Sequence, residues 1–302
     1  IHTPTEFKRD IIQSRFAQTI IDALSDLFSA EFKLTILAGD ELDSYISETK
    51  TDDTLPEVAG FTFDNFVVGP SNKYAHAAAI AVAENPGKLY NPLFIYGNSG
   101  LGKTHLLLAI GSAIHAKNPK AKIVYVKGDD FTNDLVHAIQ VGGGEDLRAK
   151  YRSADILLMD DIQFIAGKQQ TQEEFFHTFN TLYEAGKQIV VTSDRPPMEM
   201  NKLEDRIRTR LEWGLMADVQ PPDLETRMAI TRNKAAQFGV VLPDEVVTFI
   251  GETVTSNIRQ LEGVVKKLTA YRDLLEDDIT VSSVRRAIKD VIRVGTYVPT
   301  PN

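Results

Sequence analysis

The sequence predicts an α/β fold with three parts: a parallel β-sheet covered by helices on both faces, a small all-helical domain after it, and a partial α/β domain before it. Between residues 61 and 219, continuous apolar segments of strand length alternate with helical segments, as is typical of a parallel sheet buried on both faces. A glycine-rich loop joins one of these strands directly to a helix. After Pro221-Pro222 the chain alternates helices and short turns up to about Ile292, which predicts the helical domain.

Composition restricts the class of protein. The chain has 302 residues, enough for about two domains, and its 33 basic and 42 acidic residues give a net charge of -9. A dedicated duplex-DNA-binding domain is usually basic, so this charge argues against one while allowing a local basic groove. The lack of cysteine excludes disulfides and thiolate metal sites. No segment is as long as a membrane span, so we expect a cytoplasmic protein without stable membrane insertion.

The N-terminal residues 1–38 predict part of a small interaction domain. Apolar residues at near-helical spacing predict a helix between Pro4 and Ser29, and a strand is expected at Phe32–Leu37. These elements bury little alone, and the chain begins with Ile1, so we expect a fragment of a longer protein. Residues 39–58 are strongly acidic and poor in large apolar groups, which predicts a flexible linker.

The segment 59–219 carries the predicted sheet. Ser71 is expected to cap an alanine-rich helix that ends near Asn85, where a Pro-Gly pair follows. The apolar runs predict four strands: Leu93–Tyr96, Ile123–Val126, Ile156–Asp161 and Gln188–Asp194. Further helices are predicted at Phe131–Gln140, Glu145–Arg152 and Gln172–Glu184. Residues 220–293 then form the helical domain, and residues 294–302 form a C-terminal tail.

The glycine-rich loop predicts a phosphate-binding site. Gly97 ends the first strand, and after four residues Gly102-Lys103-Thr104 opens an apolar helix. Glycines let the backbone wrap around phosphates with its N–H groups inward, and the helix N-terminus adds partial positive charge. Lys103 can reach the β- and γ-phosphates, and the Thr104 hydroxyl can bind Mg²⁺. We therefore expect ATP or ADP with Mg²⁺ here; the alternative is a fortuitous loop, which the flanking strand and helix argue against.

Acidic residues follow two of the predicted strands. Asp160 can hold Mg²⁺ directly or through water, and Asp161 can orient the attacking water, because open α/β sheets bind ligands at the carboxyl ends of their strands. A solvated pair of acids is the alternative. Asp194, after the next strand, could sense the γ-phosphate or position that water, or it could cap a turn before Arg195-Pro196-Pro197.

Arginines occur in two further segments. The run Glu204–Arg210 has three arginines beside acids, and taken alone it predicts a solvated, salt-bridged helix face. Arg259, near the start of a helix in the small domain, could fold back onto the phosphates. Spacing alone does not establish a role for either segment.

Several longer runs carry a family resemblance: NPLFIYGNSGLGKTHLLLAIG, KYRSADILLMDDIQFIAGKQQTQEEFFHTFNTLYEAGKQIVVTSDRPP, RTRLEWGL, PPDLETRMAI and SNIRQLEG. From Phe61 to about Ile292 the chain resembles the DnaA family of bacterial chromosomal replication initiators, and PTEFKRDIIQSRF resembles the second half of that family's N-terminal domain. The resemblance implies an AAA+ fold, a P-loop parallel sheet with a helical lid. It also implies a slow ATPase that assembles as an ATP-bound filament at the origin, opens the duplex and recruits the replicative helicase.

The resemblance also implies roles for individual residues. Those matching the phosphate-binding loop are Gly97, Gly100, Gly102, Lys103 and Thr104. Those matching the catalytic positions are the Walker B pair Asp160 and Asp161, the first sensor Asp194, the arginine finger Arg210, which reaches the neighbouring subunit's ATP, and the second sensor Arg259. Those matching the lining of a single-stranded DNA channel are Val136, Lys168 and Thr171. The implied partners are further copies of the chain, single-stranded origin DNA, and the helicase and regulators through the N-terminal domain; contact with anionic phospholipid is also possible.

The chain departs from the family at three places. Gln170 stands where the family usually has Arg, and Gly142-Gly143-Gly144 interrupts the helical insertion. The family's C-terminal helix-turn-helix domain would follow Ile292, and only a short segment is present there, so we expect negligible affinity for duplex origin boxes. Three other functions remain as alternatives to an initiator: an initiator-like regulator, a helicase-loading ATPase, and a nucleotide-locked scaffold without turnover. The scaffold is an alternative because the second acid, Asp161, is an Asp rather than the longer Glu.

Overall fold

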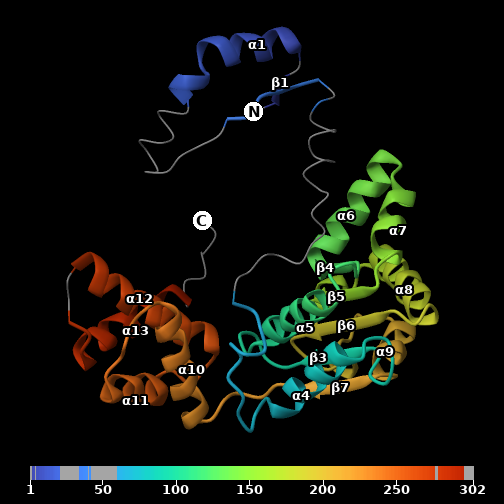
Figure 1. Cartoon of the computed structure of the whole chain (residues 1–302). Helices are drawn as coiled ribbons and strands as arrows, with labels where there is room; N and C mark the ends of the chain where they lie inside the picture. The colour runs from blue at the N-terminus through green and yellow to red at the C-terminus, as the bar shows by residue number, and fades with distance from the viewer. Residues whose placement is uncertain are drawn as a thin grey trace. The chain divides into compact units, whose positions relative to one another are not determined.

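The computed structural model describes residues 2–3, 5–20, 34–39, 41, 60–275 and 278–295, which belong to two separate units, Ile1–Asp53 and Thr54–Asn302 (Figure 1). The expected linker at 39–58 lies outside the described residues except for Gly39 and Glu41. The same holds for the end of the expected tail, from residue 296 onward.

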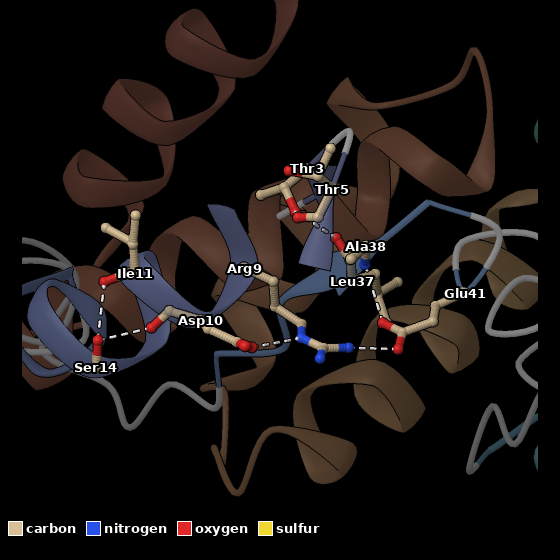
Figure 2. A network of polar contacts seen from close by, with 9 residues as sticks. All are labelled: Thr3, Thr5, Arg9, Asp10, Ile11, Ser14, Leu37, Ala38 and Glu41. Atoms are coloured by element: carbon tan, nitrogen blue, oxygen red, sulfur yellow. Dashed lines mark hydrogen bonds and ion pairs between the residues drawn. The ribbon is translucent and has the colours of Figure 1, made fainter. Parts of the chain in front are cut away.

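The N-terminal unit pairs two very short strands next to one helix. Strand β1 (His2–Thr3) runs parallel to β2 (Leu37–Ala38), and helix α1 covers Glu6–Arg15. Figure 2 shows the polar contacts that connect them: the Thr3 hydroxyl donates to the Leu37 carbonyl at 3.2 Å, and Arg9 bridges Asp10 and Glu41. Glu41 also accepts from the Ala38 N–H, and these contacts lower the pKa of its carboxyl.

The expected strand Phe32–Leu37 is wrong in its bounds. Among the described residues, β1 pairs His2 with Leu37 and Thr3 with Ala38, and residues 34–36 are not in a strand. Residues 32–33 lie outside the described part of the chain, as does the expected helix beyond residue 20.

The second unit contains a five-stranded parallel sheet with the strand order β4-β5-β6-β3-β7. Its strands are β3 (Leu93–Tyr96), β4 (Ile123–Lys127), β5 (Ile156–Asp160), β6 (Gln188–Ser193) and β7 (Leu215–Asp218). The inner strand β3 pairs Leu93 with Val190 of β6 on one side and with Leu215 of β7 on the other. All carboxyl ends therefore meet at one edge of the sheet. The predicted parallel sheet is confirmed.

Helices cover both faces because successive strand side chains point to opposite sides. Leu93 and Ile95 pack with helices α4 (Lys73–Glu84) and α5 (Lys103–Lys117) in one core. Phe94 points to the other face. The helices that contribute to the core on that face are α6 (Gly128–Val141), α7 (Gly144–Arg152), α8 (Gln169–Glu184) and α9 (Asp205–Glu212). Helices α6 and α7 lie side by side near the β4 edge (Figure 1).

In the described residues after the sheet, four helices form a core of their own (Figure 1). They are α10 (Leu224–Gln237), α11 (Asp244–Thr253), α12 (Ile258–Leu275) and α13 (Val281–Gly295). The Asp223 carboxylate caps α10 by accepting from the Thr226 N–H at 2.8 Å. Within the described residues of 220–293 there is no strand, as the sequence predicts. Among all helices that the structure describes, none has the length and apolar character needed to cross a bilayer.

Some predicted boundaries are wrong by a few residues. Helix α6 begins at Gly128 rather than Phe131, and α8 begins at Gln169 rather than Gln172. Strands β5 and β6 each end one residue early, so the acids that follow them begin connecting loops. The fifth strand, β7, was not predicted.

The predicted cap of α4 is also wrong, because Asn72 rather than Ser71 occupies the N-cap position. The Asn72 amide accepts from the Gly69 N–H at 2.9 Å and donates to the Val67 carbonyl at 3.0 Å. It therefore fixes the turn before the helix instead of capping the helix itself.

Gly214 lies where two backbones touch, just before β7. A Cβ atom there would lie 1.8 Å from the Pro92 carbonyl oxygen, and a backbone atom cannot rotate away. We expect Gly214→Ala to lower the free energy of unfolding by about 1–3 kcal/mol, the usual cost of overpacking. Urea unfolding would measure this. Gly144→Ala is the matched control, because nothing lies within 4 Å of a Cβ at that position. Equal midpoints for the two variants would contradict the prediction.

Candidate functional site

The glycine-rich loop between β3 and α5 forms hydrogen bonds with Lys103, the first residue of α5. Lys103 is only 6% exposed, and its ammonium group donates to the carbonyls of Gly97 at 2.7 Å and Asn98 at 3.0 Å. Gly97 and Gly102 have φ angles of 148° and 99°. A Cβ atom on Gly97 would lie 2.2 Å from the Val219 carbonyl oxygen, so the loop can pass there only as glycine.

The predicted acidic residues surround this lysine. Burial lowers the pKa of Lys103, and the nearby carboxylates of Asp161, Asp160 and Asp194 partly oppose that effect. Arg259 is also close enough to influence the lysine. The structure therefore brings together charged residues that are up to 156 positions apart in the sequence, Lys103 and Arg259.

Asp160 is the last residue of β5 and is almost completely buried. Its Oδ2 atom accepts from the Thr104 hydroxyl at 2.8 Å and from the Tyr125 hydroxyl at 3.2 Å, and its Oδ1 atom accepts from Thr192. The hydroxyl of Thr104 and the carboxylate of Asp160 are both hard oxygen donors, the ligands that Mg²⁺ prefers. The donor set at this position therefore fits a magnesium ion.

Tyr125 and Thr192 were not predicted. They come from β4 and β6, the strands on either side of β5, and the sequence does not reveal that order. Burial and the neighbouring Asp160 carboxylate raise the pKa of the Tyr125 hydroxyl, so it stays a neutral donor. The signal available in the sequence is a side chain with a hydroxyl group near the end of each of these two strands.

Asp161 begins the loop after β5 with a left-handed φ of 54°. Its N–H donates to the Thr192 hydroxyl at 2.9 Å, and its Oδ1 atom accepts from the Gln163 amide at 3.0 Å. The same amide accepts from the Asp194 N–H at 3.3 Å. Asp194 itself forms two bonds of 2.9 Å with Arg195, which lowers the pKa of its carboxyl.

The two predicted arginines lie in different places. Arg259 donates to the Ser99 hydroxyl at 3.1 Å, and the Ile258 N–H donates to the Gly100 carbonyl at 2.9 Å, so the start of α12 contacts the glycine-rich loop. Arg210, on α9, stacks over the Trp213 ring at 3.9 Å and lies 5.9 Å from the Phe176 ring. Arg210 is therefore held by aromatic rings on the α8–α9 surface.

The other two arginines on α9 match the salt-bridged face that the sequence predicts. Arg206 pairs with Glu204 at 2.6 Å, and Arg208 pairs with Asp205.

The three expected DNA-channel residues come from α6 and the start of α8. Val136 is exposed on α6, and the exposed Lys168 donates to Thr132 of that helix at 3.2 Å. Thr132 and Val136 are one helical turn apart, so Lys168 and Val136 share one surface. Thr171 lies in the first turn of α8, but its side chain is only 4% exposed.

A family model, a relative of known sequence and solved structures all show similarity to DnaA proteins. A family model for the bacterial DnaA ATPase domain matches residues 58–218. The chain is 49% identical over 300 residues to the chromosomal replication initiator protein DnaA of Caldanaerobacter subterraneus subsp. tengcongensis, which covers 97% of the chain and 68% of that relative.

Solved structures of DnaA proteins are also similar to this chain. The chain is similar to domain III of the Thermotoga maritima replication initiation protein DnaA, with a TM-score of 0.76 and 44% identity over 79% of this chain and 99% of that one. A structure of replication initiator DnaA bound to AMPPCP and single-stranded DNA matches with a TM-score of 0.64 and 35% identity, over 78% of this chain and 81% of the other.

Proposed function

The chain belongs to the DnaA family of bacterial replication initiators, and from this we propose that it binds ATP with Mg²⁺, assembles with further copies of itself at the origin and opens the duplex by holding single-stranded DNA. The observation that carries the proposal is the convergence of Lys103, Thr104 and Asp160 at the carboxyl edge of the sheet. We take residues 59–219 as the nucleotide-binding base and residues 220–293 as the lid.

Nucleotide binding is supported by the glycine-rich loop and by the relative that is bound to AMPPCP. The Lys103 ammonium group, which now donates to loop carbonyls, would donate to the β- and γ-phosphates instead. The N-terminus of α5 adds its partial positive charge at the same place. Gly100 and Ser99, which contact α12, would couple the bound phosphates to the lid through Arg259.

Magnesium would be held by the Thr104 hydroxyl and the Asp160 carboxylate, directly or through water. These two oxygens are 2.8 Å apart, so both can face the same ion once the proton between them points elsewhere. A magnesium ion held there would supply positive charge to the β- and γ-phosphates. Tyr125 and Thr192 fix the orientation of the carboxylate by donating to it from both sides.

ATP hydrolysis would be slow and would act as a switch for assembly. The charges of Asp161, Asp194 and Arg259 act on Lys103, which supports a role for all three near the γ-phosphate. A nucleotide-locked scaffold with the same site would bind ATP and not hydrolyse it. A single-turnover assay with radiolabelled ATP separates the two, because release of inorganic phosphate is expected only from an ATPase.

Single-stranded DNA binding is supported by the exposed Val136 and Lys168 on one surface and by the relative that is bound to single-stranded DNA. Thr171 would contribute its backbone N–H, because the first turn of a helix leaves such groups without intrahelical partners. Each subunit offers few contacts, and the chain carries a net charge of -9. Tight binding therefore requires many subunits in register, and hence ATP.

We expect the chain to bind labelled single strands in the presence of ATP far more tightly than with ADP, and to prefer them over duplex. Affinity should fall with salt with a log–log slope of about −0.7 per neutralised phosphate. Gln170→Arg should steepen that slope and tighten binding, because it adds a cation beside Lys168. Fluorescence anisotropy at several salt concentrations measures both effects.

The matched control for that experiment is Gln237→Arg, which adds the same charge to an exposed position on α10. It should leave the slope unchanged. Equal binding with ATP and ADP, a preference for duplex, or equal slopes for the two variants would each contradict the DNA-channel proposal.

A further inference from the structure

We propose that Gln163 is a positioning residue for ATP hydrolysis: its amide holds one oxygen of Asp161 so that the other oxygen can accept a proton from the attacking water. The inference rests on the proposed ATPase function and names a residue and a task beyond it. Gln163 lies in the short 3-10 helix Ile162–Ile165, which follows Asp160 at the end of β5 and Asp161 in the loop.

The position of Gln163 is fixed by its own turn. Ile162 and Ile165 are both fully buried, so this short helix is anchored on either side of the glutamine. The Asp161 backbone is held as well, because its N–H donates to Thr192 of the neighbouring strand at 2.9 Å. With both backbones fixed, the 3.0 Å bond from the Gln163 amide to Asp161 Oδ1 sets the direction of the carboxylate.

A neutral amide is suited to this task. An ionised carboxylate has about four lone-pair positions on two oxygens, so one bond from an amide leaves the second oxygen able to accept from water. An arginine or lysine at this position would also orient the carboxylate, but its charge would make the carboxylate a weaker base. Gln163 orients Asp161 without adding charge.

The other acid near the lysine is engaged differently. Both oxygens of Asp194 accept from Arg195 at 2.9 Å, which lowers the pKa of Asp194 and makes it a poor proton acceptor. The Asp194 backbone N–H donates to the oxygen of the Gln163 amide at 3.3 Å. The single amide therefore joins the ends of β5 and β6, and it leaves Asp161 as the carboxylate that can accept the proton from water.

The chemical step is a displacement at the γ-phosphorus. The water oxygen forms a bond to phosphorus, the bond from phosphorus to the β,γ-bridging oxygen breaks, and ADP leaves with that electron pair. The proton lost by the water goes to Asp161 and then to solvent or to the released phosphate. No oxidant or further reactant is required.

Two substitutions separate positioning from packing. Gln163→Met keeps the length of the side chain and removes both bonds. Gln163→Glu keeps the shape and the acceptor for the Asp194 N–H, but it loses the donor to Asp161 and places a second negative charge beside it. A positioning role predicts that both variants slow single-turnover hydrolysis at least tenfold, within the contribution of about 10²–10⁴ from a placed acid or base, while ATP affinity changes less than twofold.

A purely structural role predicts a different order. Gln163→Glu would then retain most of the rate, because it retains the shape and the bond to β6. Gln237→Met, at the exposed position on α10, is the control and should match the parent in rate and affinity. Hydrolysis by Gln163→Glu at the parent rate would overturn the proposal.

A double-substitution cycle keeps the test valid even if the Gln163 variants lose stability. In an Asp161→Asn background, Gln163→Met should slow hydrolysis no further, because the carboxylate that it positions is gone. An equal slowing in both backgrounds would overturn the proposal. A parent that hydrolyses ATP while every Gln163 variant matches it would overturn this inference alone, whereas a parent that does not bind ATP would overturn the proposed function.

Discussion

Lys103→Ala is expected to weaken ATP binding at least tenfold, which corresponds to about 1.4 kcal/mol. Lys103 is buried, and burial lowers the pKa of its ammonium group because it removes water from the charged form. Phosphate oxygens that replace the lost water therefore meet a charge in a medium of low dielectric, where attraction is stronger than at the surface. Titration with a fluorescent ATP analogue measures the change.

Two further variants test whether the loss of affinity comes from the charge of Lys103. Lys103→Met retains the apolar stem that fills the buried space, and we expect it to lose affinity as Lys103→Ala does. Lys117→Ala removes a lysine from the far end of α5 and should bind ATP like the parent. Unchanged affinity in Lys103→Met would contradict the assignment of this lysine to the phosphates.

The sheet could be predicted because four of its strands each contain a continuous apolar run. Strands β3, β4, β5 and β6 are mostly buried, and such strands give continuous apolar runs in the sequence. The edge strand β7 could not be predicted in this way, since only Ala217 of its four residues is buried. Strand β7 begins directly after Gly214, whose backbone lies against the backbone of Pro92. No local sequence pattern indicates this contact.

The N-cap of α4 shows a second feature of the fold that the sequence alone does not predict. Ser71 and Asn72 are both residues that favour the beginning of a helix. The choice between them depends on the turn at Val67 and Gly69, whose backbone groups bond to the Asn72 amide. A single-residue shift of this kind depends on tertiary contacts and is not encoded in helix propensity.

The candidate site was predictable where its residues lie at the end of a strand or in the segment that follows it. Asp160 ends β5, Asp161 and Asp194 directly follow β5 and β6, and Lys103 and Thr104 open the helix after the loop that follows β3, so the parallel topology brings all five to one edge. Arg259 was placed only by the resemblance, because its position depends on how α12 packs against the loop. The residues around Asp160 and Asp161 were missed for a different reason: the order β4-β5-β6 places Tyr125 and Thr192 beside Asp160, and that order is not readable from the sequence.

Arg210→Ala is expected to abolish ATP-dependent assembly while leaving the ATP affinity of the single subunit within twofold of the parent. The charges that act on Lys103 of the same subunit include those of Asp160, Asp161, Asp194 and Arg259, whereas Arg210 lies against Trp213 and Phe176 on the α8–α9 surface. A guanidinium held this way loses little further freedom on reaching a phosphate, because the rings already restrict it. It would act on the nucleotide of a neighbouring subunit.

Light scattering with ATP and with ADP measures assembly, and Arg208→Ala is the matched control. Arg208 lies on the same helix but is paired with Asp205, so its removal should leave assembly unchanged. The chain has one tryptophan, and Arg210 stacks on it, so the emission of Trp213 reports directly on the guanidinium. Addition of ATP should shift that emission in the parent and in Arg208→Ala, and should leave it constant in Arg210→Ala.

The size of the effect follows from the chemistry of such arginines. In other phosphoryl-transfer proteins an arginine supplied by a neighbour contributes about 10³–10⁵ in rate. We expect a smaller factor here, because slow turnover suits an assembly switch, whereas the loss of oligomers should be complete at micromolar protein. If Arg210→Ala and the parent assemble alike with ATP, Arg210 belongs with Arg206 and Arg208 to a solvated helix face, and the contact between subunits must come from another part of the chain.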